Sequence, residues 1–171
     1  MSNTVAAPLG LHSETVSEDW IDYNGHMNVA YYVLIFDHAT DAVLAHFGLG
    51  DEYRAQTGGS VFVVESHVTY RKEVLAGVRV SVDSLVLDSD SKRLHLFHEM
   101  RESGTDIILA TNELMIVHVG LATRKVSPFP ISALAQIEAT EKLHKSLGKP
   151  QQSGRKVSMI VEKSPPTPKP L

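Results

Sequence analysis

Hydrophobic positions along the chain first follow a helical period. Over residues 29–47, VAYYVLIFDHATDAVLAHF, apolar residues occupy nearly every face of the first half. A helix that is apolar on most faces is buried in its domain. Asn28 precedes it as a cap that can accept a free N–H of the first turn, and Gly48 follows its end. The pattern predicts a long buried helix, with one short helical turn after it in residues 51–59.

From residue 60 the period becomes two, which is typical of strands. Alternating segments cover residues 60–70, 78–87, 92–100 and 106–121, and turn-forming sequences separate them. Because these four segments follow one another directly, they predict an antiparallel meander. A short edge strand is expected at 11–17, and residues 131–147 return to helical spacing.

One long helix wrapped by a single curved antiparallel sheet of about five strands accounts for this order of elements. The fold class is therefore α+β, not a parallel sheet. We expect one domain over residues 1–147, ending in a surface helix. The Pro-, Lys- and Ser-rich tail over 148–171 is too poor in apolar residues to order itself alone. A single sheet leaves its edges open, so we expect a homodimer or homotetramer.

Composition narrows the function classes. The 171 residues carry a net charge of −4, which gives no reason to expect nucleic-acid binding. The absence of cysteine excludes a disulfide scaffold, a cysteine-based zinc site and a cysteine nucleophile. The first ten residues lack the features of a signal peptide, and no segment approaches the ~20 apolar residues of a membrane span. We expect a cytoplasmic protein with no membrane partner.

The segment 19–32, DWIDYNGHMNVAYY, concentrates side chains that can move protons. Asp22, Asn24 and His26 alternate, so an extended loop would place them on one side. The loop leads into the helix start, where unpaired N–H groups favour negative charge. A carboxylate beside such donors suits acyl hydrolysis, because it can attack the acyl carbon or activate water while the amides hold the oxyanion. The alternative is a plain cap and an Asn-Gly turn.

The order of elements and the segment DYNGHMN…YY resemble the hotdog-fold acyl-CoA thioesterases, the family that includes 4-hydroxybenzoyl-CoA thioesterase. The resemblance covers about residues 11–130. In that family the Asp of an Asp-x-x-Gly motif ahead of the central helix is the catalytic carboxylate, and Asp22 and Gly25 match it. A backbone N–H in the first helical turn is the oxyanion donor, which corresponds here to Val29.

Plant acyl-carrier-protein thioesterases share a related Asp-x-Asn-x-His pattern, which Asp22, Asn24 and His26 match. Those enzymes also carry a Glu after a Tyr-Arg-basic run, and YRKE places Glu73 there. The resemblance therefore implies roles for Asn24, His26 and Glu73 beside Asp22. A salt-bridge partner at a strand end is the alternative for Glu73.

Three further segments, VVESHVTYRKEVLAG, KRLHLFHEM and LATNELMIVHV, are similar to the betainyl-CoA thioesterases of carnitine breakdown. Those enzymes hydrolyse betainyl-CoA to glycine betaine and CoA. The resemblance implies an acyl-CoA substrate, with another short or aromatic acyl group as the alternative. A non-catalytic hotdog module that binds a ligand, and a dehydratase of the same fold, are the rivals.

The betaine that such enzymes release carries a quaternary ammonium group, which is best held by aromatic faces with a carboxylate nearby. Glu65 shares a strand face with Val63 and His67 in the alternating pattern and interrupts an apolar strand. The alternative is that the aromatics are core residues and that Glu65 pairs with His67 or His95. The candidate substrate-binding residues are thus Trp20, Tyr23, Tyr31, Tyr32, Glu65 and Glu73.

The nine histidines show no metal-ligand spacing. His95 and His98 are three apart on a predicted strand, so they face opposite ways, and His38 and His46 lie two helical turns apart. The chain has neither a HExxH motif nor a GxSxG motif. We therefore expect no metal and no organic cofactor.

Overall fold

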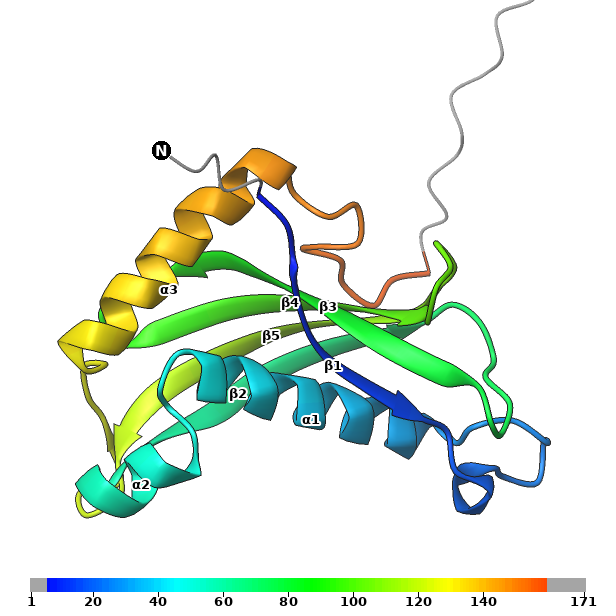
Figure 1. Cartoon of the computed structure of the whole chain (residues 1–171), viewed down its shortest axis with the longest axis horizontal. Helices are drawn as coiled ribbons and strands as arrows, with labels where there is room; N and C mark the ends of the chain where they lie inside the picture. Colours follow the sequence, from blue (N-terminus) through cyan, green and yellow to red (C-terminus); the bar gives the residue numbers. More distant parts are fainter. Residues whose placement is uncertain (1–5, 160–171) are drawn as a thin grey trace, which may run out of the picture.

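The computed structural model describes residues 6–159, and the end of the predicted tail lies outside them. A curved sheet carries helix α1 on its concave side, and α3 lies above one end of the sheet (Figure 1). The elements are β1 (Leu9–Thr15), η1 (Glu18–Trp20), α1 (Val29–His46), α2 (Asp51–Thr57), β2 (Gly59–Tyr70), β3 (Arg79–Ser89), β4 (Arg93–Glu102), β5 (Ile108–Gly120), β6 (Lys125–Val126), α3 (Ile131–His144) and η2 (Lys145–Leu147).

The sheet is antiparallel throughout, with the strand order β1-β3-β4-β5-β2 and with β6 beside β5. The predicted hotdog arrangement of one helix and about five strands is confirmed. The predicted four-strand meander is wrong for β2, which pairs with β5 at the edge opposite β1. The connection over residues 71–78 is too long for a tight hairpin and instead crosses the end of the sheet.

Helix α1 begins where the sequence predicts. Asn28 is its N-cap, and the side-chain oxygen accepts the Ala30 N–H over 2.9 Å. The helix is not buried on all sides, however. Val29, Val33, Asp37 and Asp41 form an exposed stripe at a spacing of four residues, with Val29 55% and Val33 44% exposed. The side chains that face the sheet are Tyr32, Ile35, Phe36, Ala39, Thr40, Val43 and Leu44.

A buried polar group joins α1 to the sheet. Thr40 donates its hydroxyl to the Phe36 carbonyl, so its oxygen accepts from His98 Nε2, 3.1 Å away. His98 Nδ1 then accepts the Ser84 hydroxyl over 2.7 Å. Burial lowers the pKa of His98 to about 3, so the ring is neutral. The predicted opposite orientation of His95 and His98 is confirmed, because His95 bonds to Glu113 at 2.8 Å instead.

Helix α3 packs along β3, and the chain after it returns to the sheet. Val86 donates its N–H to His144 Nδ1 over 2.9 Å. Ser153 and Gly154, in the described part of the predicted tail, both donate to Glu113 on β5. This part of the tail is therefore fastened to the chain's own sheet. Within residues 6–159, no helix has the length and apolarity needed to cross a membrane.

Candidate active site at the start of helix α1

The loop that carries the predicted catalytic residues is held by backbone hydrogen bonds. Ile21 and Met27 form an isolated antiparallel bridge, and Met27 donates its N–H to the Val74 carbonyl over 2.7 Å. Between them, the Asp22 N–H donates to the His26 carbonyl over 3.0 Å. Gly25 has φ +82°, a left-handed conformation that favours glycine, and this closes the turn. Residues 22–26 therefore form a small closed loop ahead of α1.

Asp22 is half-buried, and one of its two carboxylate oxygens has a fixed partner. Its Oδ1 accepts the Asn24 N–H over 2.8 Å, which sets the orientation of the carboxylate. The other oxygen, Oδ2, is the one available to a substrate or a water. Asn24 is exposed and His26 is half-buried in the same loop.

The start of α1 supplies hydrogen-bond donors close to this loop. The first N–H groups of a helix have no acceptor within the helix. The Asn28 side chain takes the N–H of Ala30, and the N–H of Val29 is the first of the helix. Asn28 also donates its own N–H to the Trp20 carbonyl over 2.9 Å, which joins the helix start to the segment before the loop. The Asp22 carboxylate and the Val29 N–H thus lie at the two ends of one eight-residue segment.

The predicted aromatic residues divide into two kinds. Trp20 stacks on Tyr31, with 5.2 Å between ring centroids and an interplanar angle of 10°, and both rings are half-buried at the start of α1. Tyr23 is 96% exposed at the loop tip. Tyr32, by contrast, is a buried core residue whose hydroxyl donates to the Lys72 carbonyl over 3.0 Å. The core alternative therefore holds for Tyr32 and in part for Trp20 and Tyr31, which pack against the same core cluster, whereas Tyr23 is free at the loop tip.

The two predicted glutamates lie in different places. The sequence pattern puts Glu65 on the face of Val63, but a bulge shifts the register between them. Val63 lies opposite Ile116 and Glu65 opposite Met115, so the two side chains point to opposite faces, and the predicted shared face is wrong. Glu65 consequently points away from α1.

Glu73 lies next to Val74, whose carbonyl holds the loop. Burial raises the pKa of Tyr32, and the charge of Glu73 adds to the effect, so this exposed carboxylate lies within electrostatic range of the Tyr32 hydroxyl. The structure therefore brings Glu73 toward the predicted catalytic loop and leaves Glu65 outside it.

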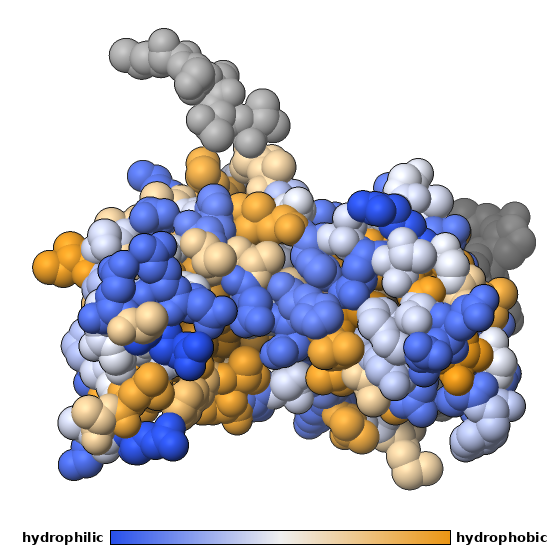
Figure 2. All heavy atoms as spheres, turned by 60° about the horizontal axis from the view of Figure 1, so that its bottom comes forward, coloured by the Kyte–Doolittle hydropathy of each residue, from blue (hydrophilic) through white to orange (hydrophobic). Residues whose placement is uncertain are grey.

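A groove of about 620 Å³ lies between α1, α2 and the first half of β2. The hydropathy pattern did not predict it, because it depends on how α2 folds back beside α1. Figure 2 shows the face that carries α1, with apolar surface gathered around the hollow toward the α2 end. Side chains that line the groove include Asp37, Asp41, Leu44, Arg54, Phe62 and Ile116.

Comparisons with known proteins match this chain to an enzyme class. The model of the thioesterase-like superfamily matches residues 16–137. A betainyl-CoA thioesterase of Pseudomonas aeruginosa is 38% identical over 151 residues, covering 88% of this chain and 95% of that protein. An L-carnitine dehydrogenase/betainyl-CoA thioesterase of Agrobacterium fabrum is 40% identical over 138 residues, which are 78% of this chain and 28% of that longer protein.

Solved structures show the same architecture. A putative thioesterase of Pseudomonas putida is 35% identical, with a TM-score of 0.78 over 90% of this chain and 98% of that one. A hypothetical protein of Staphylococcus aureus, solved in complex with CoA, is 31% identical. It superposes with a TM-score of 0.85 over 93% of this chain and 100% of its own.

Proposed function

This chain belongs to the thioesterase-like superfamily, and on that basis we propose that it hydrolyses betainyl-CoA to glycine betaine and CoA. The chain is a thioester hydrolase. The similarity to the Pseudomonas aeruginosa enzyme supports betaine as the acyl group of the substrate. The similarity to the Staphylococcus aureus protein solved with CoA supports CoA as the thiol that carries it. The single observation that carries the mechanism is the half-buried Asp22 carboxylate, oriented by the Asn24 N–H in the loop that leads directly into α1.

Asp22 acts as general base or as nucleophile. As a base, its Oδ2 takes a proton from water while the water oxygen bonds to the thioester carbon. The oxyanion accepts the Val29 N–H, and its collapse breaks the C–S bond and releases CoA as a thiolate, which then takes up a proton. As a nucleophile, the carboxylate bonds to the same carbon, CoA leaves, and water then cleaves the mixed anhydride. The products are the same in both cases.

The residues around Asp22 serve to orient it and the substrate. The Asn24 N–H holds Oδ1 and so orients the carboxylate for reaction through Oδ2. His26 is half-buried in the same loop, where its ring can hold the attacking water. The stacked Trp20 and Tyr31 offer aromatic surface at the helix start, which suits the trimethylammonium group of betaine.

The proposed enzyme is a homodimer joined along β2. This edge strand exposes apolar side chains, with Val63 49% and Val64 58% exposed, and unpaired strand edges invite pairing with another chain. Asp41 lies 13 residues after Asn28 along α1, which is about 20 Å at 1.5 Å per residue. The groove beside it is thus remote from the chain's own Asp22. Antiparallel pairing of two β2 strands reverses the partner's α1 and turns the partner's helix start toward this groove.

Thiol release across a panel of thioesters tests the proposal. Betainyl-CoA, acetyl-CoA and benzoyl-CoA are compared at matched concentrations, and the highest kcat/KM is expected for betainyl-CoA. A higher kcat/KM for acetyl-CoA or benzoyl-CoA would contradict betaine as the preferred acyl group but would keep thioester hydrolysis as the reaction. No turnover of any thioester would contradict the assignment as an enzyme and would favour a ligand-binding module.

A single turnover in ¹⁸O-labelled water distinguishes the two attacks. Label incorporated into Asp22 identifies the carboxylate as nucleophile, because hydrolysis of the anhydride at the aspartyl carbon leaves one labelled oxygen on the side chain. Label found only in glycine betaine is produced both by direct attack of water and by hydrolysis of the anhydride at its betainyl carbon, and trapping the anhydride with hydroxylamine separates these two routes. Trp20 is the sole tryptophan of the chain, so its fluorescence reports whether glycine betaine binds at this site.

A further inference from the structure

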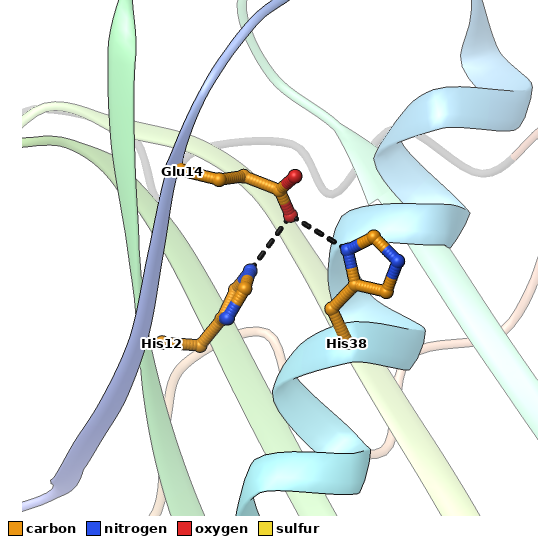
Figure 3. Close-up of side chains that lie close together, drawn as sticks. All are labelled: His12, Glu14 and His38. Atoms are coloured by element: carbon orange, nitrogen blue, oxygen red, sulfur yellow. Dashed lines mark hydrogen bonds and ion pairs between the residues drawn. The ribbon is translucent and has the colours of Figure 1, made fainter.

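Three potential metal ligands meet between β1 and α1, away from the catalytic loop of the same chain. His12 and Glu14 come from β1, and His38 comes from α1 (Figure 3). Residues two apart on a strand share a face, so both β1 side chains point toward the helix. One oxygen, Glu14 Oε1, lies 2.7 Å from His12 Nε2 and 3.0 Å from His38 Nδ1. The three ligand atoms all lie within 4.8 Å of one another.

We propose that His12, Glu14 and His38 bind a divalent cation of the zinc class. Two imidazoles and one carboxylate form a donor set that zinc and its transition-metal neighbours accept, whereas magnesium and calcium prefer oxygen ligands alone. Three protein ligands leave a fourth tetrahedral position for water. This site is separate from the proposed reaction and does not depend on it.

The geometry needs little change to accept the ion. Ligand atoms around tetrahedral zinc, bound at 2.0–2.2 Å, lie about 3.4 Å apart. The two contacts to Glu14 therefore have to open by about 0.7 and 0.4 Å, and the two histidine nitrogens, which lie within 4.8 Å of each other, have to reach the same separation by side-chain rotation. In the hydrogen-bonded cluster both rings can donate to Glu14. Metal binding requires the other tautomer of each neutral ring, with the proton on His12 Nδ1 and on His38 Nε2.

The surroundings favour positive charge. Although burial alone would raise the pKa of Glu14, hydrogen bonds from His12 and His38 lower it below its ordinary value, so the carboxylate is ionised at neutral pH. Asp41 lies close enough to His38 for the two charges to interact, and Asp37 lies beside Asp41. Within the described residues, Glu14 makes its ion pairs with these two histidines and with no lysine or arginine.

The ion would fasten the edge strand β1 to α1. His38 lies ten residues after Asn28, about 15 Å along the helix, so the ion lies away from a substrate at the start of the same chain's α1. Its effect is on stability: a ligand that binds only the folded chain raises its melting temperature. Turnover is expected without added metal.

Calorimetric titration of the untagged, chelator-treated protein with ZnCl₂, CoCl₂ and MgCl₂ tests the proposal. We expect one saturable zinc site per chain, visible absorption bands of four-coordinate cobalt, a higher melting temperature with zinc, and no response to magnesium. His38→Gln removes a ligand that is 41% exposed, so folding is preserved. It is expected to weaken zinc binding by at least about tenfold.

The matched control is His46→Gln, which changes an exposed histidine of the same helix outside the cluster. It is expected to leave zinc binding unchanged, and Glu14→Gln is expected to weaken it as His38→Gln does. Two outcomes overturn the proposal. One is the absence of saturable zinc binding, which leaves the cluster as a hydrogen-bonded clip. The other is equal binding in the His38→Gln protein and the control.

Discussion

Met27 donates its backbone N–H to the Val74 carbonyl over 2.7 Å, which fastens the loop that carries Asp22 to the segment after β2. This bond and the bridge between Ile21 and Met27 use backbone groups only. The loop is therefore held without the Asp22 side chain as a main support. Changes of that side chain should affect chemistry far more than folding.

Asp22→Asn is expected to lower kcat by about 10²- to 10⁴-fold, because an amide can neither attack nor accept a proton from water. Asparagine keeps an oxygen for the Asn24 N–H, so the melting temperature should stay unchanged. Asp19→Asn, an exposed acidic residue just before the loop, is the control and should retain full activity. Near-normal turnover by the Asp22→Asn protein would exclude this carboxylate from the reaction.

Asn28→Ala should destabilise the fold by about 1 kcal/mol, because it removes the N-cap that satisfies the Ala30 N–H. Urea unfolding measures the loss. Asn28→Ser restores a capping oxygen and should recover most of the stability. If the Ala and Ser variants unfold at the same urea concentration, the cap contributes nothing to stability.

Val64→Lys is expected to dissociate the proposed dimer, because it places a charge on the exposed part of the edge strand β2. Sedimentation should show a twofold decrease in mass. Val126→Lys introduces the same charge at a position that is also half exposed, on β6, and should leave the mass of the dimer unchanged. Equal masses for the wild type and both variants would rule out pairing through this edge.

His98 should make stability depend on pH. Its folded-state pKa of about 3 is below the unfolded value of about 6.5, so below pH 6.5 the unfolded chain binds a proton that the folded chain does not. Stability attributable to this group is therefore full above pH 6.5 and falls as the pH decreases. Between pH 7 and pH 5 the loss should be about 2 kcal/mol.

His98→Gln tests this effect, because its amide can bond to Ser84 and Thr40 in place of the ring. Urea unfolding at pH 7, 6 and 5 should show a shallower loss for this variant than for the wild type. Burial also lowers the pKa of His144, so this residue likewise makes stability fall as the pH decreases. This contribution remains in the wild type and in the His98→Gln protein. His46→Gln should retain the wild-type slope, and an unchanged slope in His98→Gln would contradict the assignment.

Local sequence signals predicted most elements because they depend on neighbouring residues. The cap at Asn28 and the left-handed turn at Gly25 follow from side-chain and backbone chemistry within a few residues. The closed loop of residues 22–26 directly ahead of α1 is local in the same way. The exposed stripe beginning at Val29 was not predicted, because exposure depends on which faces of α1 the sheet covers.

The sequence by itself determined the helix, the alternating strands and the loop of Asp22, since these depend on periodicity and on contacts within one turn. The tertiary structure alone decided that β2 lies at the far edge, that a bulge turns Glu65 away from α1, and that His12 and Glu14 meet His38. These relationships join segments far apart in the chain. The physical reason is that periodicity states which face of an element is apolar, but not which other element that face will meet.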